Sequence, residues 1–185
     1  MQIQLQSAKI IDPTSSFHGD RLDILICDGI IEKIDKKINA DKATVIARDD
    51  LHLSSGWFDS NVSFGEPGYE ERETLSHGLH VAATSGFAHI AYNTNTNPLP
   101  TTKADIAFLM RKTADTPTLI HPKAHITSES KNNQLADLND LSLAGAVGFS
   151  NNKTPIDNPH MLLLALQYAR GFDGLIESFP LDPQL

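Results

Sequence analysis

Histidines are the first residues to consider, because imidazole is the commonest metal ligand in proteins. The sequence contains eight of them. His77 and His80 have a spacing that lets one helix face chelate an ion, but a helix outside the fold is better interpreted as a solvated surface. His121 and His125 share one face of a predicted strand about 13 Å apart, at about 3.3 Å per residue, so they cannot bind the same ion. The others are isolated in the sequence: His18, His52, His89 (expected in the core) and His160.

Carboxylates and amides form a second set of candidates. Glu177 and Asp182 could serve as general acid or base, but a lone carboxylate without a metal or partner is usually solvated. Asn95 could hold a carboxylate ligand, or it could simply be a turn residue in the run 93–98, since Asn and Pro favour turns. No Ser-His-Asp or Cys-His arrangement and no Gly-rich phosphate loop is evident. The only cysteine, Cys27, leaves no cysteine cluster for zinc.

The composition limits the classes of partner. The formal charge of −8 and the pI of about 5.4 argue against a nucleic-acid backbone or an anionic membrane as the main partner. No apolar run approaches the ~20 residues of a membrane span, and the N-terminus lacks a signal-peptide pattern. We therefore expect a cytoplasmic protein with no nucleic-acid and no membrane partner.

The elements that must position these side chains fall into two groups. Residues 1–52 predict a small β unit, part of a composite β-sandwich, with Asp28-Gly29 as a hairpin turn. Its predicted strands are 1–5, 8–11, 22–27, 30–34 and 43–47.

Residues 53–185 alternate between predicted strands and helices, which indicates a parallel sheet in a barrel or a doubly wound fold. The predicted strands are 56–64, 87–92, 118–126, 146–150 and 174–179, and the predicted helices are 70–85, 103–114, 134–143 and 159–170. A complete (β/α)₈ barrel takes roughly 250 residues, whereas 133 follow His52. We expect the first five strands or so of a barrel, and whether a further segment supplies the rest stays open.

Four segments, in order, resemble the dihydroorotases of the amidohydrolase superfamily. Gly56–Gly68 reads GWFDSNVSFGEPG, similar to the family's first barrel strand with its Glu-Pro-Gly turn. Asn95–Pro98 is similar to a segment whose asparagine holds the substrate carboxylate. The last two segments are 143–152, LAGAVGFSNN, and 176–182, IESFPLD. The resemblance implies a partial TIM barrel of the metallo-dependent hydrolase type preceded by a small β-sandwich unit, and it assigns substrate binding to Asn95.

The departures from the family pattern fall on its metal ligands. The resemblance places zinc-binding histidines at Asn61 and Ser63, a bridging aspartate at Asn151 and a further histidine at Phe179. The substrate-binding arginine is replaced by Gly65. Neutral amides and hydroxyls are weak zinc ligands and phenylalanine has no donor atom. We therefore expect neither a bound metal nor another cofactor, although active family members use zinc.

The resemblance leaves three functions open. The first is an inactive homologue in pyrimidine biosynthesis that acts as a structural or regulatory partner of aspartate transcarbamoylase. The second is an active dihydroorotase or cyclic amidohydrolase, converting dihydroorotate to carbamoyl aspartate with a rebuilt metal site. The third is a ligand-sensing pseudo-enzyme. Dihydroorotase-like proteins are often homo-oligomers or complex subunits, and we expect the same here.

Overall fold

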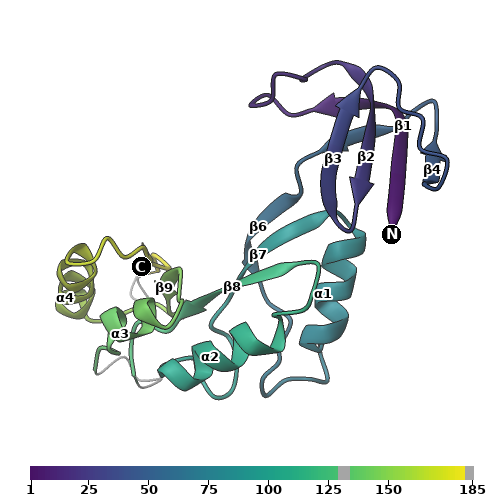
Figure 1. Ribbon diagram of the computed structural model, residues 1–185. Helices are drawn as coiled ribbons and strands as arrows, with labels where there is room; N and C mark the ends of the chain where they lie inside the picture. Colours follow the sequence, from purple (N-terminus) through teal and green to yellow (C-terminus); the bar gives the residue numbers. More distant parts are fainter. Residues whose placement is uncertain (129–133, 182–185) are drawn as a thin grey trace. The chain divides into compact units, whose positions relative to one another are not determined.

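The computed structural model describes residues 1–128 and 134–181 (Figure 1). The chain divides into two compact units, Met1–Ser55 and Gly56–Leu185. The sequence predicts a boundary after His52, but the structure places it after Ser55, because the short strand His52–Ser54 (β5) pairs with the first strand of the chain. Within the described residues, no helix is long and apolar enough to cross a membrane.

The N-terminal unit is a five-stranded mixed sheet. Its order is β3-β2-β1-β4, with β5 also paired to β1. Asp28 and Gly29 both have positive φ, +49° and +83°, as a tight hairpin turn between β2 and β3 requires. The strands are β1 (Gln2–Ile11), β2 (Arg21–Cys27), β3 (Ile30–Asp35) and β4 (Thr44–Ala47).

The first strand is continuous where the sequence predicts two. β1 runs from Gln2 to Ile11 with a register irregularity between Leu5 and Ala8. Ser7 lies in that irregularity at φ +53°, and its backbone N–H donates to the carboxylate of buried Asp23 at 2.8 Å. A bulge therefore joins the two predicted strands, and a side chain from β2 satisfies the backbone donor that the bulge frees.

The second unit is a parallel five-stranded sheet in the order β10-β9-β8-β7-β6. The five strands and four helices expected from the sequence are present, in the expected order. The strands are β6 (Trp57–Val62), β7 (Phe87–Tyr92), β8 (Leu119–Ala124), β9 (Gly148–Ser150) and β10 (Ile176–Glu177). The helices are α1 (Leu75–Thr84), α2 (Lys103–Lys112), α3 (Leu138–Leu143) and α4 (Pro159–Arg170).

The helices begin where the sequence supplies caps. Thr102 accepts from the backbone of Asp105 while the Asp105 carboxylate accepts from the backbone of Thr102, which forms a capping box at α2. At α4 the cap is Asn158, followed by Pro159 in the first turn. These caps fix where each helix leaves the preceding loop, and so they fix the length of the loops at the carboxyl edge of the sheet.

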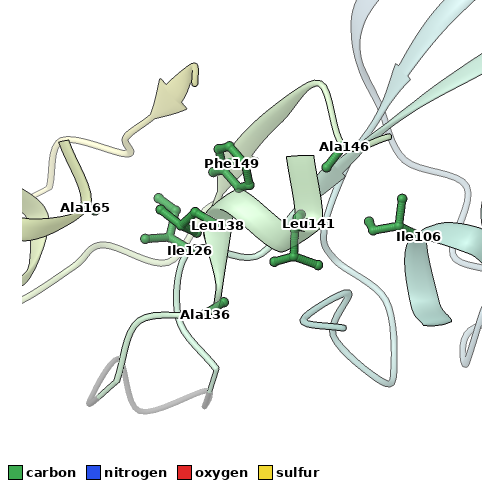
Figure 2. Close-up of a cluster of buried hydrophobic side chains, with 9 residues drawn as sticks. Ile106, Ile126, Ala136, Leu138, Leu141, Ala146, Phe149 and Ala165 are labelled. Atoms are coloured by element: carbon green, nitrogen blue, oxygen red, sulfur yellow. The ribbon is translucent and has the colours of Figure 1, made fainter. Parts of the chain in front are cut away.

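Apolar side chains between sheet and helices decide which strand residues face the opposite side. Ile90 and Tyr92 of β7 and Ile120 of β8 pack in one cluster with residues of α1 and α2. Because strand side chains alternate, His121 and Lys123 of β8 lie on the face opposite these helices. A second cluster, centred on Leu138, Leu141 and Phe149, joins β9 to α2, α3 and α4 (Figure 2). The sheet thus has one face covered by helices, and the polar side chains of His121 and Lys123 lie on the other, where Phe58 packs against His121.

Gly68, in the Glu-Pro-Gly turn, offers a test of this architecture. Its φ is +96°, and a Cβ there would lie 2.1 Å from the carbonyl oxygen of Asn97. Gly86 has a similar φ of +91°, but a Cβ there would meet nothing within 4 Å. Both Gly→Ala variants should cost about 1 kcal/mol of backbone strain, and Gly68→Ala about 1–3 kcal/mol more for the overlap. Urea unfolding followed by fluorescence of Trp57, the only tryptophan, measures the free energy of unfolding of both variants. Equal losses of stability in Gly68→Ala and Gly86→Ala would contradict the prediction.

Candidate functional site

A chain of hydrogen bonds links polar side chains at the carboxyl ends of β6, β7 and β8. Lys123 Nζ donates to Asn93 Oδ1 at 3.4 Å, and Asn93 Nδ2 donates to Ser63 Oγ at 3.2 Å. Ser63 Oγ then donates to Asn95 Oδ1 at 2.8 Å. Because an ammonium group can only donate, each following group must accept from one side and donate to the other. This relay fixes the orientation of the Asn95 amide and leaves its Nδ2 as a hydrogen-bond donor.

The first member of the relay is a buried cation. Lys123 is 5% exposed, forms an ion pair with Glu177 of β10, and also donates to Asn61 Oδ1 at 3.3 Å. Glu177 is not the lone carboxylate that the sequence suggested, because its side chain, although 43% exposed, forms an ion pair with Lys123 two strands away in the sheet. Sequence reasoning missed Lys123 as a residue of this site. The one feature of the sequence that could have indicated it is its position between His121 and His125 on one face of a predicted strand. The second carboxylate considered, Asp182, lies outside the described residues.

These groups do not fit a catalytic metal. Asn61 and Ser63, which stand at the two positions that the resemblance assigns to zinc-binding histidines, are neutral, and both are in the hydrogen-bonded network of Lys123. A positively charged group that donates to Asn61 opposes a dication in the same place. In residues 1–128 and 134–181, no group of three or more His, Cys, Asp or Glu side chains is placed to hold a metal ion. No chemical step through a metal follows from this arrangement.

The third of these positions, Asn151, is used for structure. Asn151 is 4% exposed; its Oδ1 accepts from the backbone N–H of Ile126 at 3.1 Å, and its Nδ2 donates to Thr127 Oγ1 at 3.3 Å. It thereby holds the loop that follows β8 against the end of β9. A cavity of about 140 Å³ opens beside it, and its lining includes Thr94, Asn95, Leu99, His125, Asn151 and Asn152.

Phe179 is placed apart from the other predicted positions. It follows the end of β10 and is 40% exposed. The residue of this segment that reaches the polar network is Glu177, through its ion pair with Lys123. The structure therefore brings together Asn61, Ser63 and Asn95, places Asn151 at the neighbouring cavity, and leaves Phe179 outside.

Two histidines that the sequence leaves isolated from each other are in contact. His89 Nδ1 and His121 Nε2 are 3.0 Å apart on the adjacent strands β7 and β8, and both side chains are half-buried. Burial, and secondly the neighbouring His89, lower the pKa of His121. Of the pair on α1, His77 is exposed and contacts Glu73 rather than His80.

Comparison with known proteins identifies the family. A sequence profile described as Dihydro-orotase-like matches residues 52–184, well over half of the chain. The chain belongs to the dihydroorotase-like family. A dihydroorotase of Pelotomaculum thermopropionicum is 32% identical over 176 residues, which is 95% of this chain and 41% of that protein. One of Lactococcus lactis subsp. lactis is 30% identical over 185 residues, 100% of this chain and 44% of that protein. The chain thus spans less than half the length of these dihydroorotases.

Solved structures agree with the fold of this dihydroorotase-like chain. An L-hydantoinase (dihydropyrimidinase) from Arthrobacter aurescens superposes with a TM-score of 0.74 at 16% identity, over 94% of this chain and 39% of that one. A dihydroorotase superposes with a TM-score of 0.63 at 14% identity, over 95% and 50%. At such identities the likeness shows the fold alone, which is a β unit followed in the sequence by a parallel part-barrel.

His125 should make the stability of this dihydroorotase-like chain depend on pH. Burial lowers the pKa of His125 from 6.5, and its hydrogen bond to the Thr127 carbonyl opposes that effect in part. Below about pH 6.5 the unfolded chain therefore binds a proton that the folded chain does not, and stability falls as pH falls. The contribution should reach at most about 1.4 kcal/mol per pH unit. Urea unfolding measured at several pH values between 5 and 8 gives the free energy of unfolding as a function of pH. This free energy should change less with pH in His125→Gln than in the unmodified protein, and an identical pH dependence would contradict the expectation.

Proposed function

We propose that this chain is part of a catalytically inactive dihydroorotase homologue in pyrimidine biosynthesis. The observation that carries the proposal is the buried ammonium of Lys123, which donates to Asn61 where the resemblance expects a zinc ligand. Opening a cyclic amide at neutral pH relies on a metal-bound hydroxide and a polarised carbonyl. An ammonium already engaged by Glu177 supplies neither of these.

The role proposed for such a homologue is that of a structural or regulatory partner of aspartate transcarbamoylase. Its basis is the resemblance to dihydroorotase-like proteins that lack zinc ligands and support the assembly of that enzyme. A subunit of this kind needs the fold and its surfaces but not the metal chemistry. Loss of ligands together with retention of the fold supports this role over one that depends on turnover.

The first experiment is an assay of dihydroorotate ring-opening by the purified protein, with zinc supplied and a zinc–hydroxide blank without protein. No turnover above the blank is expected. Turnover at an ordinary enzymatic rate, roughly 1 s⁻¹ or more, would contradict the proposal. It would favour the alternative, an active cyclic amidohydrolase whose metal site is rebuilt from other residues.

The partner is tested separately. Tagged aspartate transcarbamoylase from the same source should retain this protein in stoichiometric amount on co-expression, and a zinc-binding dihydroorotase from an unrelated source serves as the control. If this protein and the control dihydroorotase are recovered in equal, substoichiometric amounts, the proposed partnership is excluded. The proposal that the protein is catalytically inactive is not affected by that result.

A further inference from the structure

Helix α4 is apolar on more than the side that packs against its own unit. Residues 161–169 have the sequence MLLLALQYA. The side towards the core carries Ala165 and Ala169, which are both buried. A surface helix of a globular protein has one apolar stripe towards the core, whereas a helix that is apolar on several sides is buried on several sides. The other apolar residues of α4 therefore indicate further contacts.

One of the other sides of α4 makes contacts within the unit. The hydroxyl group of Tyr168 donates to the carboxylate of Asp137, the N-cap residue of α3, at 2.6 Å. The ring of Tyr168 packs edge to face on Phe172. Leu164 lies one turn before Tyr168 and so shares its side of the helix. This side of α4 is directed towards the start of α3.

A different side of α4 carries a stripe that solvent reaches. The stripe consists of four residues at intervals of four, three and four positions: Pro159, Leu163, Leu166 and Arg170. Leu163 and Leu166 are each 49% exposed, and neither belongs to a hydrophobic cluster of the described residues. Apolar residues at alternating intervals of three and four form the seam between two paired helices. The α4 stripe therefore has the pattern of a helix-pairing surface.

The α4 stripe is complementary to itself when two copies run antiparallel. Its spacing is the same in both directions, so a two-fold axis between Leu163 and Leu166 places each of them against the other in the second copy. The same axis brings Arg170 to the level of Pro159, beside Asp157 of the second copy. The side chains of Arg170 and Asp157 are exposed, and neither has an ion-pair partner among the described residues. A parallel pairing would bring like charges together, so the charges favour the antiparallel one.

We propose that this chain pairs with a second copy of itself through the α4 stripe, with the two α4 helices antiparallel and Arg170 of each copy paired with Asp157 of the other. Helix α4 has 12 residues and is about 18 Å long. The contact is therefore smaller than a standard interface of about 1,600 Å². The dimer should be weak, with a Kd on the order of 10–100 µM. Pairing needs neither a metal nor a second protein, so its test is independent of the proposed function.

Sedimentation equilibrium of the full chain at pH 7.5 and low ionic strength tests the proposal, over concentrations from about 1 to about 500 µM that bracket this Kd. The measured mass should rise from the 20.2 kDa of one chain towards twice that value. The mass of one chain at every concentration would overturn the proposal. An assembly that grows beyond two chains would also overturn it, because an isologous contact about a two-fold axis closes at the dimer.

A substitution in the α4 stripe assigns the interface. Leu166→Glu should weaken the dimer at least about tenfold, because each dimer loses two leucines and gains two charges in the seam. Leu164→Glu is the matched control, since it makes the same change on the side of α4 that is directed towards α3. Circular dichroism shows whether both variants are folded. Equal dimer affinities of the two folded variants would place the interface elsewhere and overturn the proposal.

An exchange of charges tests the direction of the pairing, and it keeps the proposal testable if Leu166→Glu does not fold. Arg170→Asp alone should weaken the dimer about tenfold, because it sets two carboxylates side by side at both ends of the contact, and Asp157→Arg alone should do the same with two cations. The variant with both substitutions should regain the original affinity within about threefold, because the ion pairs re-form with reversed signs. A double variant as weak as the single ones would overturn the antiparallel pairing.

Discussion

Glu177→Gln is expected to destabilise the barrel unit by about 2–3 kcal/mol, whereas Lys123→Met should cost about 1 kcal/mol or less. The difference follows from burial. The Lys123 side chain is 6% exposed and the Glu177 side chain is 43% exposed. Removing the carboxylate leaves a buried ammonium with only the neutral acceptors Asn61 and Asn93, while removing the ammonium leaves a carboxylate that water can reach.

Urea unfolding followed by Trp57 fluorescence measures both variants, because Trp57 lies in β6 of the same unit. The control is Asp140→Asn, which breaks the ion pair between Asp140 and Lys103. Both of those side chains are exposed by about as much as Glu177 or more, so the loss should be less than about 1 kcal/mol. Equal losses for Glu177→Gln and Lys123→Met would show that the buried ammonium has no special cost here.

Restoring the two first-strand histidines alone is expected not to restore zinc binding. The variant Asn61→His with Ser63→His supplies two imidazoles, but Lys123 still donates into that place. Two unit charges about 4 Å apart repel by about 4 kcal/mol at an effective dielectric of about 20, and a dication doubles this. That repulsion is several powers of ten in affinity, so the charge of Lys123 outweighs the gain from new ligands.

Adding Lys123→Met to the two histidine substitutions should therefore raise zinc affinity by at least about a hundredfold. Equilibrium dialysis, with bound zinc measured by atomic absorption, compares the zinc affinity of the double and triple variants. The control is a second triple variant that carries Lys103→Met, from the exposed ion pair with Asp140, in place of Lys123→Met. Tight zinc binding by the double variant would contradict this expectation. It would mean that Lys123 moves aside at little cost, and that the lack of histidines at positions 61 and 63 by itself prevents zinc binding.

The elements of the chain follow closely from local pattern. Apolar runs alternating with amphipathic segments predict the five strands and four helices of the second unit, because period and capping are properties of neighbouring residues. The helix at 159–170 is predicted to the residue, where Asn158 caps it and Pro159 opens it. The bulge at Ser7 was missed, since the carboxylate that accepts from the freed backbone N–H belongs to Asp23 on another strand.

The sequence by itself also predicted which of the family's metal-ligand positions hold other residues, at Asn61, Ser63, Asn151 and Phe179, because the type of a side chain needs no coordinates to recognise. Only the tertiary structure decided what stands in their place. Lys123 meets Glu177 across the sheet, His89 meets His121, and Ser63 donates a hydrogen bond to the Asn95 amide, which lines a cavity together with His125. The residues of each pair are more than thirty positions apart in the sequence. The physical reason is that charge and hydrogen-bond partnership depend on distance in space, which strand order and register set and which local pattern does not contain.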